Sequence, residues 1–175
     1  MSIEKVVSVL NRMRSDGIIE RYAVGGAVAA TFYLEPFSTV DINVFVPFRI
    51  ESGSWVANPE PLFNCLRDKG FGMDGEYVSI GGWPVQLLPA TDGLVEEALL
   101  EAINHEVKAE IASVFSMEHL AAIALATGRS KDRARLSQFI ESAKFDPGRF
   151  QAIVVRHQLL PAWTKFQKQF LVGEQ

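Results

Sequence analysis

The segment that decides the fold is residues 22–46, which reads YAVGGAVAATFYLEPFSTVDINVFV. Residues 18–24, which overlap the start of this segment, are rich in β-branched and aromatic residues and predict a short strand. The Ala-rich residues 27–34, directly after two glycines, predict a helix that Pro36 ends. In residues 39–46 valine or isoleucine occupies every second position, the clearest strand pattern of the chain. The segment therefore predicts a strand, a glycine turn, a helix and a second strand.

The glycines and the second strand bring polar chemistry to one place. Gly25 and Gly26 let a backbone approach a ligand closely at a helix start, where free N–H groups favour anions. Asp41 and Asn43 are two residues apart, so their side chains share one face of the strand and can converge on a hard cation such as Mg²⁺. This arrangement suits phosphoryl or nucleotidyl transfer. A plain strand-to-helix turn followed by a solvated strand also fits these residues.

The rest of the chain alternates helical periodicity with short strands. Gly81 and Gly82 predict a hairpin turn between strands over 76–80 and 83–88, and residues 107–114 predict a further strand. Helices are predicted over residues 3–15, 59–69, 93–103, 116–126 and 131–144, with a last helix from 146 that is interrupted near Pro161. We therefore expect an α/β (α+β) core over residues 1–115 and a helical part over 116–175 packed on it.

Composition limits the class of protein. The chain has 175 residues, 48% hydrophobic and 22% charged, which is normal for one globular domain or a small domain with a helical extension. A single cysteine, Cys65, excludes an internal disulfide and a cysteine-based zinc site and fits a reducing cytoplasm. No secretory signal or membrane span is evident in the sequence, so we expect a cytoplasmic protein.

The net charge of −4 conceals an asymmetry. Residues 1–128 hold 17 acidic and 8 basic side chains, whereas residues 129–175 hold 4 acidic and 9 basic ones. The basic C-terminal part fits either a surface that faces a polyphosphate or nucleic acid, or an ordinary solvated helical surface. His105, His119 and His157 lack the spacing of metal ligands, and we expect them on the surface or in the core.

The segment resembles the nucleotidyltransferase superfamily, whose fold is that of the polymerase-β group, and is most similar to bacterial AbiEii-type proteins of type IV toxin–antitoxin systems. The resemblance rests on Gly25-Gly26, Thr39 and Asp41-Ile42-Asn43. Residues 83–89, WPVQLLP, resemble a later strand that often supplies a third carboxylate. Residues 128–136, GRSKDRARL, resemble a basic Lys-Asp helix start. The similarity covers about residues 18–140.

The resemblance implies a nucleotidyltransferase fold, with a mixed, twisted sheet flanked by helices and a C-terminal helical part. It also implies transfer of a nucleotide from an NTP with Mg²⁺ to an RNA, protein or small-molecule acceptor. Asp41 is then a catalytic residue and the metal ligand, and Asn43 is its weaker catalytic partner. The nucleotide-binding residues implied in the same way are Gly25, Gly26, Gln86, Lys131 and Arg135.

Three positions depart from the pattern of the superfamily. Ala27 stands where a serine or threonine is common, Asn43 replaces the second carboxylate, and Gln86 occupies the third metal position. Asp74 and Asp92 lie in predicted loops and are the candidate substitutes. Two hypotheses therefore stay open, an active nucleotidyltransferase and a non-catalytic nucleotide- or partner-binding module of the same fold. Membership of a toxin–antitoxin pair is compatible with both.

Overall fold

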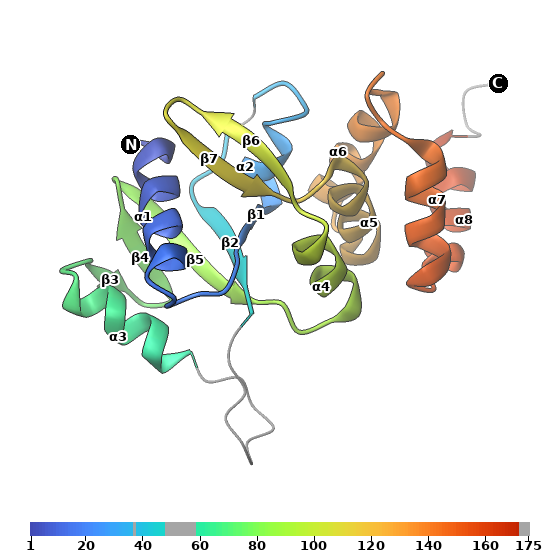
Figure 1. Cartoon of the computed structure of the whole chain (residues 1–175). Coiled ribbons are helices and arrows are strands. Elements are labelled where there is room, and N and C mark those ends of the chain that lie inside the picture. Colours follow the sequence, from blue (N-terminus) through green and yellow to red (C-terminus); the bar gives the residue numbers. More distant parts are fainter. Residues whose placement is uncertain (37, 48–58, 172–175) are drawn as a thin grey trace, which may run out of the picture.

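The structure is a computed structural model and describes residues 1–36, 38–47 and 59–171. Its centre is a seven-stranded sheet in the order β3-β4-β5-β2-β1-β7-β6 (Figure 1). The strands are β1 (Ala23–Gly25), β2 (Ile42–Val46), β3 (Met73–Asp74), β4 (Tyr77–Ile80), β5 (Trp83–Pro89), β6 (Ile103–Val107) and β7 (Glu110–Val114).

The sheet is mixed, as the sequence predicts. β1 runs antiparallel to β2 and parallel to β7, and β2 runs parallel to β5. The remaining pairs, β3 with β4, β4 with β5, and β6 with β7, are antiparallel. The parallel neighbours β2 and β5 are far apart in sequence, so the predicted Asp-x-Asn strand and the WPVQLLP strand meet at the middle of the sheet.

The helices of the described chain are α1 (Ile3–Ser15), α2 (Gly26–Ala30), α3 (Glu60–Asp68), α4 (Gly93–Leu100), α5 (Met117–Thr127), α6 (Ser130–Glu141), α7 (Pro147–Arg156) and α8 (Leu160–Phe166), with a π-helical turn over Gln167–Leu171. From Met117 onward every regular element in the described residues is helical, and these helices gather at one side of the sheet (Figure 1). Within the described ranges, no helix has the length and apolar character needed to cross a bilayer.

The alternation in β2 divides the sheet into two faces. Ile42, Val44 and Val46 are fully buried in the core, whereas Asn43 and Phe45 point to the other face and are half-buried. The apolar stripe of α1, which includes Leu10 and Met13, belongs to the same core cluster. One face of the central strands is thus closed by packing, and the opposite face carries the polar residues.

Several predicted helices and strands were longer than the observed ones. β1 is Ala23–Gly25 and not 18–24, α2 ends at Ala30 rather than residue 34, and β2 starts at Ile42 rather than residue 39. The prediction of one strand over 107–114 was incomplete, because β6 precedes β7 and forms a hairpin with it. β6 is an edge strand of mostly polar sequence (INHEV), so it lacks the apolar pattern by which a buried strand is identified.

Each glycine at the start of α2 is required for a different reason. At Gly25, a Cβ atom would lie 2.5 Å from the Phe45 ring and 3.0 Å from the Phe115 ring. Gly26 has φ +64° and, with a Cβ atom, would approach the Asn43 side-chain nitrogen to 2.7 Å. The glycine pair therefore lets the turn into α2 lie directly on β2 and its neighbours.

We expect Gly25→Ala to lower the free energy of unfolding by about 1–3 kcal/mol, because the added methyl group has to displace packed aromatic rings. Urea unfolding followed by circular dichroism measures the change. Gly72→Ala is the matched control, since nothing lies within 4 Å of a Cβ atom there. Equal stability of both variants would contradict the packing at Gly25.

Candidate functional site

Three of the residues implied by the resemblance lie in one row across the sheet. Asn43 of β2 pairs with Gly25 of β1 on one side and with Gln86 of β5 on the other. Paired residues on adjacent strands point to the same face. The structure thus brings Gly25, Asn43 and Gln86 together, and Gly26 adjoins Asn43 from the start of α2.

Asn43 and Gln86 are half-buried amides without a side-chain hydrogen bond or ion pair to another residue in the described part of the chain. A buried or half-buried amide that lacks a partner costs free energy unless water or a ligand satisfies it. Both side chains can donate and accept. Asn43 and Gln86 therefore place neutral hydrogen-bonding groups on the polar face of the sheet, opposite to the buried face of β2.

Asp41 directly precedes β2 and lies on the rim of this face. Its carbonyl oxygen accepts a hydrogen bond from Thr39 Oγ1 at 3.2 Å. The residue lines an open cavity of about 460 Å³ whose other walls include Asp74, Tyr77 and Ser79. Of the two candidate substitute carboxylates, Asp74 shares the cavity with Asp41.

The other candidate substitute has a structural task. Asp92 is the N-cap of α4, and its carboxylate accepts a hydrogen bond from the backbone N–H of Val95 at 2.9 Å. This cap satisfies a free donor at the helix start. Asp92 is therefore used by α4 and not by the row around Asn43.

The donor atoms near Asp41 fit one Mg²⁺ ion and not a pair. Asp41 belongs to no group of three or more acidic, histidine or cysteine side chains close enough to share an ion, within the residues the structure describes. Mg²⁺ usually keeps several waters and takes one or two carboxylates together with substrate phosphates. A single ion that arrives with a phosphate ligand is compatible with the carboxylates of Asp41 and Asp74 in this cavity, whereas two ions would need more acidic ligands.

The glycine turn is only a limited phosphate cradle. The space beside Gly25 is filled by Phe45 and Phe115, whose ring centroids lie 4.9 Å apart. The helix that follows has five residues, so its aligned peptide dipoles contribute little. Packing against the two rings explains why residue 25 is a glycine. Of the two glycines, Gly26 is the one that lies beside the Asn43 side chain.

The predicted basic residues Lys131 and Arg135 lie on α6, which packs chiefly against α5. Asp132 between them is buried and forms an ion pair with Arg129 at 2.6 Å. Arg135 lies 3.8 Å from the same carboxylate, and burial lowers the pKa of its guanidinium. Lys131 is exposed. The Lys-Asp helix start therefore holds a buried acid in place, and of the two predicted cations Lys131 is the one on the surface.

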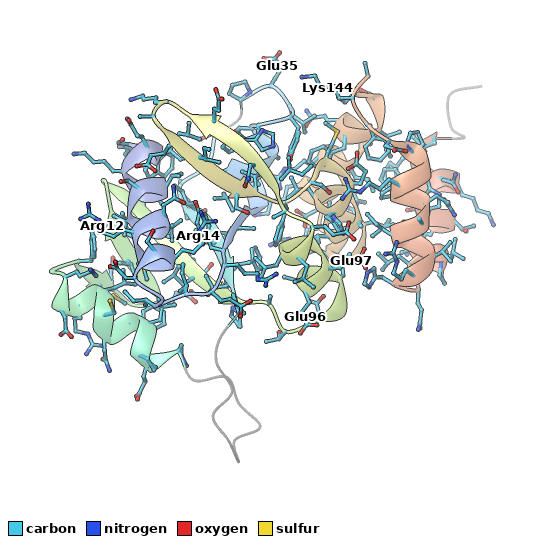
Figure 2. The ribbon with its side chains drawn as sticks, in the orientation of Figure 1. Arg12, Arg14, Glu35, Glu96, Glu97 and Lys144 are labelled. Carbon is cyan, nitrogen blue, oxygen red and sulfur yellow. The ribbon has the colours of Figure 1, made fainter. Side chains whose placement is uncertain are left out.

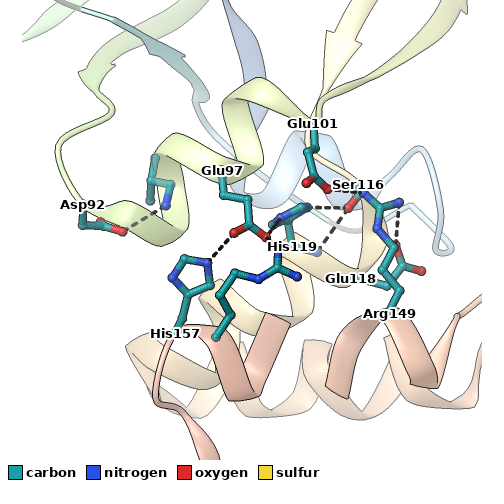
Figure 3. A network of polar contacts seen from close by, with 10 residues as sticks. Asp92, Glu97, Glu101, Ser116, Glu118, His119, Arg149 and His157 are labelled. Atoms are coloured by element: carbon teal, nitrogen blue, oxygen red, sulfur yellow. Dashed lines mark hydrogen bonds and ion pairs between the residues drawn. The ribbon is translucent and has the colours of Figure 1, made fainter. Parts of the chain in front are cut away.

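A polar network that the sequence did not predict joins α4, α5 and α7 (Figure 3). Glu97 of α4 lies at its centre. One of its oxygens accepts a hydrogen bond from His119 Nε2 at 3.2 Å, and the other accepts one from His157 Nε2 at 2.8 Å. Arg156 adds an ion pair at 3.3 Å. His119 and His157, which lack metal-ligand spacing, thus share one carboxylate.

Ser116, His119 and Glu97 form a hydrogen-bonded chain that resembles a nucleophile arrangement. His119 donates from Nε2 to Glu97, so its Nδ1 accepts from Ser116 Oγ at 2.8 Å. The Ser116 side chain is also the N-cap of α5 and accepts the His119 backbone N–H. Both residues are completely buried. The chain of bonds is consequently structural, because no substrate reaches the hydroxyl.

A second branch fixes α7 to α5 and α4. Glu118, which is 5% exposed, accepts the backbone N–H of Asp146 at 3.1 Å and lies 3.7 Å from the Arg149 guanidinium. Arg149 also donates to Glu101 at 3.0 Å. Glu97, Glu101 and His119 could geometrically hold a cation. In this structure Arg149 and Arg156 supply the positive charge there.

The network contains two titratable groups whose pKa differs from the ordinary value. Burial lowers the pKa of His119 below its ordinary value, against the opposing effect of Glu97. Burial raises the pKa of Glu97, but hydrogen bonds from His157 and His119 and the charge of Arg156 outweigh it and leave the pKa lowered. Burial also lowers the pKa of His105. In each case the folded state disfavours the added proton.

We expect the free energy of unfolding to fall as the pH drops below about 6.5, the pKa of a histidine in an unfolded chain. Between that value and the lower pKa of the folded chain, only the unfolded state takes up the proton. The lowered pKa of Glu97 extends the loss to more acidic pH. Urea unfolding at a series of pH values from 7.5 to 4 measures it.

His119→Gln tests the origin of this dependence. The variant should be less stable at pH 7.5 by about 1–3 kcal/mol, because buried partners lose their hydrogen bonds. Its stability should also change less between pH 7 and 5 than that of the parent chain. An unchanged slope would show that His119 is not among the groups responsible.

The comparisons with known proteins concern the fold. No family model matches the chain, and no curated protein matches it either. Among solved structures, an antigenic nucleotidyltransferase-like protein from Paracoccidioides brasiliensis is 13% identical, with a TM-score of 0.57 over 96% of this chain and 94% of that one. The antibiotic-resistance factor ANT(2'')-Ia is 12% identical, with a TM-score of 0.52 over 95% and 97%. The chain therefore has the mixed sheet and flanking helices of nucleotidyltransferase-like folds, as the sequence predicts.

Proposed function

We propose that this chain is a nucleotidyltransferase-like protein that binds an NTP on the polar face of its sheet and transfers a nucleotide from it. The observation that carries the proposal is the row of Gly25, Asn43 and Gln86 beside the cavity of Asp41. This row lies where two parallel strands, β2 and β5, present half-buried polar side chains that have no partner among the described residues. The likeness in fold to nucleotidyltransferase-like proteins supports the choice of ligand.

Each residue has a role in the proposal. Asp41 would hold one Mg²⁺ together with the phosphates of the nucleotide, and the ion would neutralise phosphate charge. Asn43 and Gln86 would donate hydrogen bonds to phosphate or sugar oxygens. The backbone at Gly26 would lie against the ligand next to Asn43. On α6, Lys131 and Arg135 would together bind a triphosphate or an RNA acceptor.

A second candidate is a nucleotide- or partner-binding module without transfer activity. The observation in its favour is the neutral character of the row, because amides of Asn43 and Gln86 stand where carboxylates are expected. Transfer depends on strong neutralisation of the phosphate charge that develops during the reaction. Binding of a nucleotide without transfer needs less neutralisation of phosphate charge than transfer does, and it is compatible with amide side chains at these positions.

The cellular setting belongs to the same proposal. We infer a cytoplasmic protein with a core over residues 1–115 and a helical part over 116–175, whose basic surface would meet an RNA or protein acceptor. The resemblance to AbiEii-type proteins predicts membership of a toxin–antitoxin pair. Growth arrest on expression, relieved by a neighbouring gene product, supports that membership, and normal growth contradicts it.

We expect Asp41→Asn to weaken Mg²⁺-dependent binding of ATP or GTP at least about tenfold, because the variant loses the carboxylate that directly precedes β2 beside the row. Isothermal titration calorimetry with and without Mg²⁺ measures the affinity. Asp68→Asn is the control, since it removes an equal charge from the exposed end of α3. Incubation with labelled NTPs and candidate acceptors then tests transfer.

The outcomes separate the two candidates. Transfer that disappears in Asp41→Asn supports the enzyme. Nucleotide binding without transfer supports the binding module. Transfer that survives Asp41→Asn contradicts the site, and absence of any nucleotide binding contradicts both candidates.

We also expect that restoring a carboxylate creates a stronger ion site. Asn43→Asp is close to isosteric and places a second acid on the face of Asp41, two residues away. The two like charges destabilise the fold unless a cation lies between them. The melting temperature of the variant should therefore rise when millimolar Mg²⁺ is added, more than that of the parent chain. Equal responses would show that residues 41 and 43 do not share an ion.

A further inference from the structure

We propose that the cavity between α1, the end of α3 and β4 is a binding site for a small amphipathic anion, with an apolar body and one carboxylate or phosphate group. The cavity has a volume of about 450 Å³, within the range of small-molecule sites. Its charged lining consists of Lys5, Arg12 and Lys69. Its apolar lining includes Val9, Met13, Phe71 and Ile80.

The three cations converge for reasons of local structure. Lys5 and Arg12 lie seven residues apart on α1, so they share one helix face with Val9 between them. Lys69 ends α3 and is held toward α1 by an ion pair with Asp16 at 3.5 Å. Figure 2 shows Arg12 directed toward the β3 and β4 side of α1, away from Arg14.

The floor of the cavity is fixed by close backbone packing. The backbone N–H of Ser2 donates to the carbonyl oxygen of Gly81 at 2.9 Å. A Cβ atom at Gly81 would lie 2.8 Å from the Ser2 carbonyl oxygen and 2.9 Å from Lys5 Cβ. The start of α1 and the β4–β5 turn are thus in direct contact, which fixes the position of Lys5 relative to Gly81.

Charge complementarity identifies the class of ligand. Residues 1–128 contain only 8 basic side chains against 17 acidic ones, yet three of the 8 line this cavity. Lys5 and Arg12 form no ion pair with any residue within the described ranges. The nearby acid Asp16 is paired with Lys69. Glu110 accepts a hydrogen bond from Asn11 at 2.8 Å, and it lies near enough to Arg12 for that positive charge to help lower its pKa. Three cations above an apolar floor, of which Lys5 and Arg12 have no ion pair in the described residues, match an anion with an apolar body.

This site is distinct from the proposed nucleotide site. Ile80 of β4 lines the cationic cavity, whereas Tyr77 and Ser79 of the same strand line the cavity of Asp41. Alternate residues of a strand point to opposite faces of a sheet. The two cavities therefore lie on opposite faces of β4, and either can fail an experimental test without the other.

The experiment titrates the full chain with 1-naphthoate, with 1-naphthyl phosphate and with neutral 1-naphthylmethanol. We expect at least one anion to bind about tenfold tighter than the alcohol, with an affinity that falls as salt is added. In ¹H–¹⁵N spectra, the amides of Ser8, Arg12 and Gly81 should shift on binding, and those of Asn43 and Gln86 should not. The double variant Lys5→Gln/Arg12→Gln should bind the anion no better than the alcohol.

Arg14→Gln is the matched control, because it removes a charge from the same helix outside the cavity. It should leave binding of the anion unchanged. The replaced side chains are exposed, and circular dichroism verifies that each variant is folded. Equal affinity for anion and alcohol, equal effects of the double variant and Arg14→Gln, or shifts confined to the Asn43 row would overturn the proposal. A dimer that the double variant dissociates, with no binding of either anion, would also overturn it and assign the cavity to a second copy of the chain.

Discussion

The contact between Gly26 and Asn43 is the constraint on which the centre of this structure depends. A side chain at residue 26 would collide with the Asn43 amide, and Gly25 is closed off in the same way by Phe45 and Phe115. The two glycines therefore allow β1 and α2 to lie directly against β2. That approach sets the row of Gly25, Asn43 and Gln86 across three strands, on the face opposite to the buried side chains of β2.

Local patterns predicted the parts of this arrangement that depend on local physics. The alternation around Asn43 identified β2, and Gly81-Gly82 identified the hairpin of β4 and β5. The capping roles of Asp92 and Ser116 follow from the preference of short polar side chains for helix starts. The alignment of Gln86 with Asn43 was implied by a resemblance and not by any local pattern, because it depends on pairing between strands about forty residues apart.

The network around Glu97 could not be predicted, because its members come from three helices separated by long stretches of chain. Each histidine in isolation has the sequence context of a core or surface residue. Only tertiary packing places His119 and His157 on the two oxygens of one carboxylate. The same holds for Asp132, whose neighbours Arg129 and Arg135 form part of a basic run in the sequence but surround a buried acid in the fold. Part of the positive charge of residues 129–175 is therefore paired with a buried carboxylate.

The position of β4 between two cavities limits how the sequence of this chain can change in evolution. Ile80 and Ser79 are adjacent, and they belong to two separate cavities on opposite faces. A shift of one residue in strand register turns every side chain of a strand to the other face. An insertion or deletion of a single residue beside Gly81 would thus exchange the apolar and polar surfaces of β4 and damage both cavities at once. Divergence among related chains should therefore proceed here by substitution, while the length of this hairpin stays constant.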